Sequence, residues 1–359
     1  MWWSVCLLVS AERFLVSFHP FGPNNQLLGI RNALILAKLS NRTLVVPRLF
    51  SHYLEDSEPY THAFHELYET KDTVVDLDEL CERHAYRTIP APLLLHKRKY
   101  KKVLQQRLLD SLSFGTEIQI TEEIWFDNPQ VSLKDIPDLI ANSVLARNSS
   151  VVVVGIFNLI QFPSRTLIDN HQILNMLKLV RIGSQWIHMA QQLLAENSMQ
   201  HCSVCVHIRP KPDVDSCLFG WSDAQDRIPP TCAKGTPTFG NFKSRIGATL
   251  DGLGNCDSPK LFLAMPRKLK SLRIERKFSE VETVYFEDML TTSVSRSLTG
   301  FEESFLEQAI CSQTNAFIGS ASSTWTWTVE MERYFLGNGD YPIQRMLQHA
   351  DLSKGTNLA

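Results

Sequence analysis

The chain begins with a strand, a turn, a helix and a second strand, and this order of elements restricts the possible folds more than any other feature. Residues 14–18 are apolar and run into the Gly- and Pro-rich turn 19–23, which is typical of a strand that ends abruptly. Residues 24–39 then carry apolar side chains at helical spacing, and residues 43–46 form a second strand candidate that ends at Pro47. Two strands joined through a helix are typical of a βαβ unit, so we expect an α/β fold with a parallel sheet.

Strand-like runs alternate with helical segments along the rest of the chain. The run at 151–156 is largely β-branched, as expected for a strand that is buried on both faces. Apolar periodicity over residues 174–197 predicts one long helix, and a new strand–helix alternation begins at Cys202. Four strand candidates then follow, at residues 204–208, 260–264, 283–286 and 316–319. Because 359 residues are enough for two domains, we expect one domain over residues 12–195 and a second over residues 196–359.

The composition is ordinary for a soluble globular protein and points away from two classes of partner. The formal net charge is -2, which gives no reason to expect nucleic acid or an anionic membrane surface as a partner. No apolar run approaches the roughly 20 residues that a membrane-spanning helix needs, so we expect no membrane span. A basic run at 96–102 is interpreted as a solvated surface segment.

Several features bear on the cellular compartment. Residues 1–11 are apolar and end in small residues, which fits either a short signal peptide or a first core strand, and the sequence leaves both open. The chain also carries two N-glycosylation sequons, at Asn41-Arg42-Thr43 and Asn148-Ser149-Ser150, together with more cysteines than a cytosolic protein of this length needs. These features favour an oxidising compartment, and we expect the chain in the lumen of the endoplasmic reticulum or Golgi.

The cysteines indicate disulfides more strongly than a metal site. Cys202 and Cys205 have the spacing of a metal-ligand pair, but no second pair follows at the distance of a zinc site, so no metal is expected there. Cys217, Cys232 and Cys256 lie in a segment rich in Gly, Pro and Asp that has little else to hold it. We therefore expect disulfides in that segment.

A His and an Arg end the first strand of the second half. His207 and Arg209 are two residues apart, so they lie on one face of the strand, and prolines follow directly. Arginine carries a rigid fork of donors that suits phosphate, and ligands of α/β sheets bind at the carboxyl ends of strands. Phosphate binding is one interpretation of Arg209. A salt bridge to a neighbouring domain is the other, and the strand alone does not choose between them.

A second phosphate-binding feature follows the last strand. Ser322, Ser323 and Thr324 come shortly after Gly319 and open a helical segment from about residue 325. The first amides of a helix lack partners and its dipole is positive there, so hydroxyl side chains at this point complete an anion site. A plain helix cap would account for one serine but not for three hydroxyls in a row. Because both features follow strands of the same half, we expect one diphosphate between them.

Two amide side chains open the first helix, at the corresponding end of the first strand. Asn24 and Asn25 follow the turn at 19–23, at the carboxyl edge of the predicted sheet. Amides there can bind an acceptor or a phosphate. The alternative is that an asparagine only caps the helix.

Three segments together resemble the GDP-fucose protein O-fucosyltransferase superfamily, including its plant-type branch. Residues 22–26 and 37–47 are similar to the first motif of the family. Residues 207–213 match its His-x-Arg-x-x-x-Asp motif, with Cys217 downstream, where the family often has a cysteine. Residues 317–333 are similar to the C-terminal motif. The matches occur in the order of the family and span most of the chain.

This resemblance implies a GT-B-like architecture of two Rossmann-like domains that face a cleft. It implies that the first domain lies on the acceptor side and that the second binds GDP-fucose, the donor substrate. The reaction implied is an inverting transfer of fucose to a Ser or Thr hydroxyl that needs no metal and no cofactor. Arg209 would be the catalytic residue, because it would neutralise the phosphate of the GDP leaving group. The substrate-binding residues would be Asn24, Asn25, His207, Asp213, Ser322, Ser323 and Thr324.

The sequence departs from the family pattern at two places. Pro23 stands where relatives often carry Gly, and Ala264-Met265-Pro266 stands where they tend to have acidic and hydroxyl groups. These departures favour an alternative, a catalytically silent module that binds GDP or a nucleotide sugar. Another alternative is transfer of a different nucleotide sugar, or transfer to a glycan acceptor. Asp213-Val214-Asp215 also resembles the metal-binding DxD string of another glycosyltransferase fold, but the family motif already accounts for Asp213, so we expect no manganese.

Overall fold

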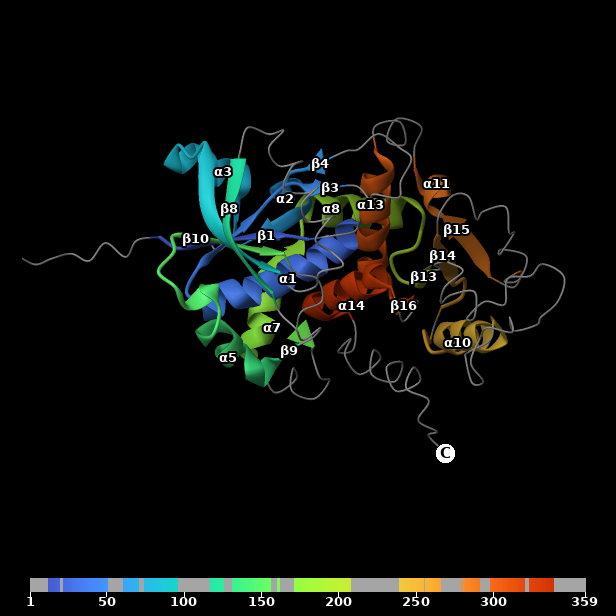
Figure 1. The fold of residues 1–359 in the computed structure, drawn as a ribbon. Coiled ribbons are helices and arrows are strands. Elements are labelled where there is room, and N and C mark those ends of the chain that lie inside the picture. Colours follow the sequence, from blue (N-terminus) through green and yellow to red (C-terminus); the bar gives the residue numbers. More distant parts are fainter. Residues whose placement is uncertain are drawn as a thin grey trace, which may run out of the picture. The chain divides into compact units, whose positions relative to one another are not determined.

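The computed structural model divides into two compact units, residues 1–181 and residues 182–359 (Figure 1). The division falls between Arg181 and Ile182, earlier than the predicted boundary between residues 195 and 196. The structure describes residues 12–19, 22–50, 61–70, 74–95, 117–125, 131–155, 160–161, 171–207, 239–254, 256–265, 279, 281–290, 298–319 and 323–338.

The first unit is built on a six-stranded parallel sheet in the order β6-β2-β1-β10-β7-β8. Its strands are β1 (Phe14–Phe18), β2 (Thr43–Val46), β6 (Val74–Asp76), β7 (Thr88–Leu95), β8 (Glu117–Trp125) and β10 (Val151–Gly155). Helix α1 (Pro23–Leu39) connects β1 to β2, which confirms the βαβ unit predicted from the sequence. β1 lies between β2 and β10, so the direction of the strand order changes there, and the carboxyl end of β1 is a typical ligand position.

Short elements surround this sheet. They are β3 (Leu49–Phe50), β4 (Thr61–His62), α2 (Phe64–Leu67), β5 (Tyr68–Thr70), α3 (Leu77–His84), β9 (Val131–Ser132), η2 (Leu133–Asp135), α5 (Ile136–Ala141), η3 (Val144–Ala146), β11 (Ile160–Gln161), α7 (His171–Leu177) and β12 (Val180–Ile182). The core is a cluster of apolar residues from alternating positions of the strands, among them Phe14, Val16, Val45 and Val153. The continuous apolar run of β10 is completely buried, as its β-branched composition predicted.

A buried arginine fastens the amino edge of the first sheet. Arg42 is 5% exposed, and its guanidinium donates to the carbonyl oxygens of Phe14, Leu145, Arg147 and Ser149 over 2.8–3.4 Å. Burial, and then the nearby charge of Arg13, lower the pKa of Arg42 to about 10, which still leaves it cationic at neutral pH. Arg42 is the middle residue of the first sequon, so this tripeptide also has a structural role.

The second unit is built on a four-stranded parallel sheet in the order β15-β14-β13-β16. Its strands are β13 (Ser203–His207), β14 (Lys260–Ala264), β15 (Glu282–Tyr285) and β16 (Ala316–Ile318). Its helices are α8 (Ser184–Glu196), α10 (Phe239–Asp251), α11 (Phe286–Met289), α13 (Gly300–Gln313) and α14 (Thr324–Leu336). The four strand candidates of the second half are therefore confirmed, with ends shifted by at most one residue.

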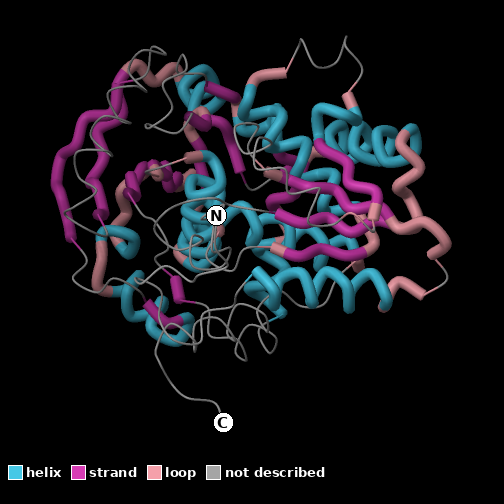
Figure 2. The backbone as a smooth tube through the Cα atoms, turned by 90° about the vertical axis from the view of Figure 1, so that its right-hand side faces the viewer, coloured by secondary structure: helices cyan, strands magenta, loops and turns pink. Residues whose placement is uncertain are grey.

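Helices cover both faces of this four-stranded sheet (Figure 2). On one face, Ile246 of α10 packs in a cluster with Val204, Val206 and Leu263. On the other face, a disulfide joins Cys205 of β13 to Cys311 of α13. This layered arrangement of helices around a parallel sheet is what the alternating pattern predicted.

The single helix predicted over residues 174–197 is wrong. The segment forms α7, then the short strand β12, then α8, because the β-branched residues Val180 and Ile182 enter a strand and Gly183 caps the next helix. The buried face of α8 packs on α13, and the ring of Trp186 meets that of Phe305 edge to face at 5.4 Å. Since α13 belongs to the second unit, α8 belongs there too, which explains the earlier division of the chain.

The described residues contain two disulfides, and both lie in the second unit. Cys202 bonds to Cys256, and Cys205 bonds to Cys311. The two cysteines of the metal-like pair therefore have separate partners, which agrees with the prediction that they hold no metal. Cys256 forms a disulfide as expected, but its partner Cys202 lies outside the segment for which disulfides were predicted. The other two cysteines of that segment, Cys217 and Cys232, lie outside the described residues.

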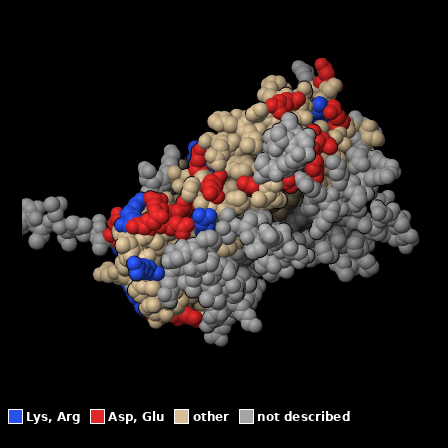
Figure 3. All heavy atoms as spheres, turned by 90° about the horizontal axis from the view of Figure 1, so that it is seen from above, with Lys and Arg blue, Asp and Glu red and all other residues tan. Residues whose placement is uncertain are grey.

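Charged side chains of both signs lie next to each other on the face drawn in Figure 3. Ion pairs between exposed residues include Arg83 with Glu79 and Arg147 with Glu122. Exposed pairs of this kind are each worth only about 0–1 kcal/mol, so they add little to the stability that the buried sheets provide. Within the described ranges, no helix is long and apolar enough to cross a membrane.

Candidate functional site

The candidate site lies at the carboxyl ends of β13 and β16 in the second unit. From β13 the chain moves outward through β14 to β15, and then returns to the other side of β13 as β16. The strand order thus reverses between β13 and β16, and open α/β sheets bind ligands in the crevice at such a point. His207 is the last residue of β13. Five residues separate β16 from α14, and the last of them, Ser323, is the N-cap of α14.

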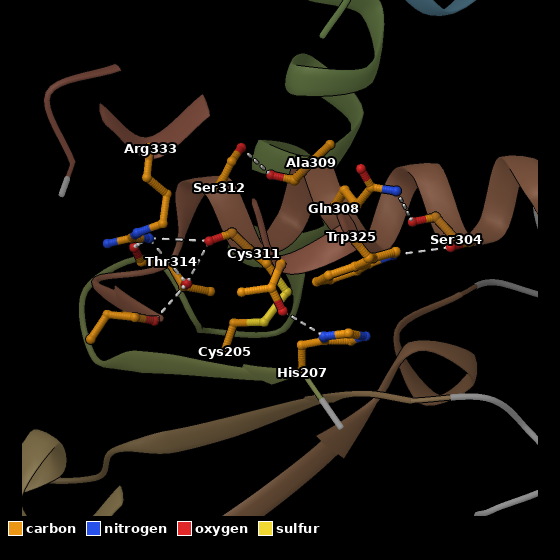
Figure 4. Close-up of a disulfide and its surroundings, with 12 residues drawn as sticks. Cys205, His207, Ser304, Gln308, Ala309, Cys311, Ser312, Thr314, Trp325 and Arg333 are labelled. Carbon is orange, nitrogen blue, oxygen red and sulfur yellow. Dashed lines mark hydrogen bonds between the residues drawn. A yellow bond between two sulfur atoms is a disulfide. The ribbon is translucent and has the colours of Figure 1, made fainter. Parts of the chain in front are cut away.

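The first turn of α14 contacts the side chain of His207 directly (Figure 4). Nδ1 of His207 lies 2.8 Å from Oγ1 of Thr326. The imidazole also stacks on the indole of Trp325, with ring centroids 4.1 Å apart and 17° between the planes. The structure therefore brings together the strand end at His207 and the helix that the three predicted hydroxyl residues open.

Close approach between α14 and the end of β16 depends on Gly319. A Cβ at this position would lie 2.2 Å from Cγ2 of Thr326 and 2.6 Å from its Oγ1, and 2.8 Å from Cζ of Phe317. Any residue other than glycine would thus push the first turn of α14 away from the sheet. The contact between Thr326 and His207 therefore depends on residue 319 having no side chain.

Ser323 has a buried hydroxyl with no hydrogen-bond partner in the described part of the chain. The residue is 3% exposed, and its side chain makes no capping bond to the amides of α14. Buried hydroxyls in folded proteins are almost always hydrogen-bonded, so one without a partner points to a ligand. The first-turn amides and the positive dipole end of this 13-residue helix suit an anion at this position.

The remaining predicted residues of the second unit are placed as follows. Thr324 is the first residue of α14 and is half-buried. Ser322, Arg209 and Asp213 lie outside the described residues, as does the DxD string that contains Asp213. Among the residues described, no group of His, Cys, Asp or Glu could hold a metal ion.

One apolar residue, Ala264, adjoins His207 on the β14 side. Ala264 is the register partner of His207 across the two strands, and both Ala264 and Met265 are buried. Relatives were expected to carry acidic and hydroxyl groups near this point. Ala264 therefore offers no polar side chain beside His207, and Met265 packs in the cluster with Val204 and Val206 on the other face of the sheet.

In the first unit, neither Asn24 nor Asn25 is the N-cap of α1, which excludes the alternative that one of them only caps this helix. The N-cap of α1 is Gly22, and Pro23 occupies the first helical position, where a missing amide hydrogen costs nothing. Asn24 and Asn25 follow in the first turn and are half-buried. Both lie near the carboxyl end of β1, where the strand order changes.

A small pocket of about 10 Å³, with room for about one water molecule, lies at the carboxyl ends of β1 and β2. Its wall is formed by the ends of β1 and β2 and by α1, and it includes His19, Gln26 and Arg48. The Gln26 amide donates from Nε2 to the Phe50 carbonyl at 2.8 Å and accepts from the Phe50 amide at 3.1 Å, so it fixes the chain beyond β2. Arg48 pairs with Asp78 at 3.2 Å.

Sequence reasoning missed the side chains that hold His207. Trp325 and Thr326 belong to the alternating segment Thr324-Trp325-Thr326-Trp327-Thr328, which was read only as a helix. Thr326 and His207 are 119 residues apart, so no local pattern could pair them. The one available signal was the unusual alternation of Thr and Trp directly after the predicted anion site.

Comparisons with known proteins identify the family and the fold of this chain. Residues 16–336 match the family described as GDP-fucose protein O-fucosyltransferase. The structure is similar to POFUT1 crystallised with GDP, with a TM-score of 0.57 and 14% identity over 91% of this chain and 97% of that chain. It is also similar to POFUT1 crystallised with GDP-fucose, with a TM-score of 0.56 and 14% identity over 91% of this chain and 95% of that chain. No curated protein matches the sequence.

At this identity the structural similarity establishes the fold, and the family match establishes the membership. The predicted α/β, GT-B-like fold class with Rossmann-like units is confirmed. The family is one of glycosyltransferases that use GDP-fucose, which confirms the predicted class of enzyme family. The chain belongs to the GDP-fucose protein O-fucosyltransferase family.

Proposed function

We propose that this protein transfers fucose from GDP-fucose to the hydroxyl of a Ser or Thr residue in an acceptor protein. The proposed reaction inverts the anomeric carbon and uses no metal ion. Family membership supports the donor and the reaction class. The single observation that carries the proposal is the buried, unpartnered hydroxyl of Ser323 at the start of α14, next to His207 at the end of β13.

In the proposed mechanism the second unit binds GDP-fucose. Ser322, Ser323 and Thr324 bind the diphosphate together with the first amides of α14. His207 positions the nucleotide sugar, and Asp213 orders the loop that carries Arg209. This arrangement places donors around the group that must leave as GDP.

The chemical step exchanges one bond to the anomeric carbon for another. The acceptor oxygen bonds to the anomeric carbon while the bond to the β-phosphate oxygen breaks, and the electron pair of that bond leaves with GDP. The acceptor proton passes to solvent or to a base. Arg209 neutralises the charge that develops on the leaving phosphate, and preorganised donors of this kind typically contribute roughly 10²–10³ in rate each.

In the same proposal the first unit provides the acceptor side. Asn24 and Asn25 lie near the carboxyl end of β1, and their amides suit a hydroxyl or a sugar. We further propose that the protein works in the lumen of the secretory pathway, which the two disulfides support.

One observation favours a second candidate, a module that binds GDP without catalysis. The apolar residue Ala264 lies beside His207, where polar groups were expected. A binding module needs the anion site at Ser323 but not a complete set of catalytic groups. A transferase that uses another nucleotide sugar or a glycan acceptor is tested by the same experiment.

The test is a melting-temperature screen followed by a transfer assay. The protein is heated with GDP, UDP, GDP-fucose and UDP-sugars, and we expect stabilisation by the two guanosine compounds only. GDP release from GDP-fucose is then measured with and without a chelator, and with protein and glycan acceptors. Binding of GDP without release would establish the silent module. Preference for UDP would refute GDP-fucose as the donor. Loss of activity with the chelator would refute the metal-free mechanism.

A further inference from the structure

The imidazole of His207 is held from two directions inside the second unit. Thr326 holds Nδ1 at 2.8 Å, and Trp325 covers one ring face at a centroid distance of 4.1 Å. The three side chains are 7%, 3% and 8% exposed, respectively. A side chain at a strand end can otherwise choose among several rotamers. Here a hydrogen bond and a stacking contact fix both torsions of the ring.

The stacking partner is itself held by the next helix. The indole nitrogen of Trp325 donates to Oγ of Ser304 on α13 at 3.1 Å. α13 is bonded to β13 through the disulfide between Cys311 and Cys205. Cys205 and His207 are two residues apart, so they lie on the same face of β13, under α13 and α14 (Figure 4). A covalent and hydrogen-bonded frame thus surrounds the His207 ring.

This frame determines what the other ring nitrogen can do. A neutral imidazole has one donor nitrogen and one acceptor nitrogen, and the bond at one nitrogen sets the role of the other. Since Nδ1 faces Thr326, Nε2 lies on the opposite side of the ring, away from that contact. A phosphate oxygen accepts hydrogen bonds and does not donate them, so Nε2 can bind it only when it carries the hydrogen.

We propose that Thr326 and Trp325 are positioning residues that hold His207 as the Nε2–H tautomer, with this hydrogen directed to the diphosphate of the donor. In this arrangement the Thr326 hydroxyl donates to Nδ1, and Trp325 sets the plane of the ring. The inference rests on the proposed function, because it takes GDP-fucose as the ligand. α14 would then have two roles. Its N-terminus would bind the anion, and its first turn would orient His207, the hydrogen-bond donor on β13.

The chain offers a matched set of variants for the test. Thr326→Val removes the hydroxyl but keeps the shape, and Thr326→Ser keeps the hydroxyl. Thr328→Val is the control, because Thr328 is equally buried on the same helix and its hydroxyl donates to the Thr324 carbonyl instead. For each protein, the imidazole nitrogens are followed by NMR after selective ¹⁵N-histidine labelling, and His207 is assigned by its loss in His207→Gln. The dissociation constant of GDP and the kcat and KM for GDP-fucose are measured in parallel.

We expect the wild type to show the Nε2–H tautomer at His207 at mildly alkaline pH. Thr326→Val should mix the tautomers and raise the GDP dissociation constant and the KM roughly 3- to 10-fold, about the worth of one oriented hydrogen bond. Thr326→Ser should restore both within about twofold, and Thr328→Val should leave both unchanged. An Nδ1–H tautomer in the wild type would overturn the proposal. Unaltered His207 signals in folded Thr326→Val, or an equal loss of affinity in Thr328→Val, would do the same.

Two provisions keep the test decisive. If Thr326→Val does not fold, Ser304→Ala replaces it, because this change loosens Trp325 from α13 without touching His207. A mixed tautomer in Ser304→Ala then supports the proposal, and an unaltered His207 overturns it. If the wild type does not bind GDP, the proposed function fails, while the ¹⁵N spectra still show whether Thr326 sets the tautomer of His207.

Discussion

Replacing the hydroxyl of Ser323 should have opposite effects on the free protein and on GDP binding. In the free protein this hydroxyl is buried and has no partner among the described residues, so it contributes a desolvation cost and no hydrogen bond. Ser323→Ala removes that cost. An ordinary serine or threonine cap behaves in the opposite way, because it satisfies a helix amide. The same unit contains such a cap at Thr299, whose Oγ1 accepts from the Glu302 amide at 3.3 Å while the Glu302 carboxylate accepts from the Thr299 amide at 2.7 Å.

The expected magnitudes separate the two positions clearly. An unsatisfied buried hydroxyl costs about 1–3 kcal/mol, so Ser323→Ala should raise the free energy of unfolding by about 1 kcal/mol once the intrinsic preference for Ser at a cap is deducted. Thr299→Ala should lower it by about 1 kcal/mol. For a unit of this size, each change corresponds to about 3 °C in Tm. A hydrogen bond from Ser323 to a charged phosphate is worth about 1.5–3 kcal/mol, so the GDP dissociation constant should rise roughly 10- to 150-fold in Ser323→Ala.

The assay combines thermal unfolding without ligand and calorimetric titration with GDP, for the wild type and both variants. The expected pattern is a higher Tm with weaker GDP binding for Ser323→Ala, and a lower Tm with unchanged GDP binding for Thr299→Ala. The reasoning is refuted if Ser323→Ala lowers the Tm as Thr299→Ala does, because Ser323 would then be an ordinary cap. Unchanged GDP affinity in Ser323→Ala would remove this hydroxyl from the proposed phosphate site.

Three further predictions concern other parts of the structure. Arg209→Ala should keep the fold, by circular dichroism and Tm, but abolish fucose transfer; a variant that still transfers from GDP-fucose would exclude Arg209 from the mechanism. Gly319→Ala should displace the first turn of α14 and cost about 1–3 kcal/mol of stability in denaturant unfolding, with weaker GDP binding, because its Cβ would lie 2.2 Å from Thr326. Gly300→Ala is its control, since a Cβ there meets nothing within 4 Å, and equal losses in both would contradict the packing argument. Arg42→Ala should lower the stability of the first unit by about 3 kcal/mol, because buried carbonyl oxygens lose their donor; a loss under about 1 kcal/mol in the same unfolding assay would show that water replaces the guanidinium.

The elements that could be predicted are those whose signals are local. The strand at residues 14–18 and the helix after it have clear periodicity and clear breakers, and both are present. The prediction of one helix over residues 174–197 was wrong because Val180 and Ile182 fit a helical repeat as well as a strand. Only tertiary contacts select the strand. The disulfide partners could not be predicted for a related reason. Cys202 and Cys205 are close in sequence, but they bond to residues 54 and 106 positions away.

The candidate site shows the same limit. The strand end at His207 and the hydroxyl residues after Gly319 stand out locally, because breakers and polar residues follow apolar runs. The contacts of His207 with Trp325 and Thr326 depend on the order of strands in the sheet, which places β16 beside β13. No spacing in the sequence encodes that order, so these two side chains were not identified before the structure was known.

The two disulfides have a practical consequence for producing this protein. They close chain segments of 54 and 106 residues, and restricting these segments in the unfolded chain is worth about 4 and about 5 kcal/mol, respectively. Domains are commonly stable by only about 5–15 kcal/mol in total, so synthesis in a reducing bacterial cytosol would remove a large part of what keeps the second unit folded. Expression in an oxidising host or periplasm should therefore determine whether soluble, nucleotide-binding material is obtained at all.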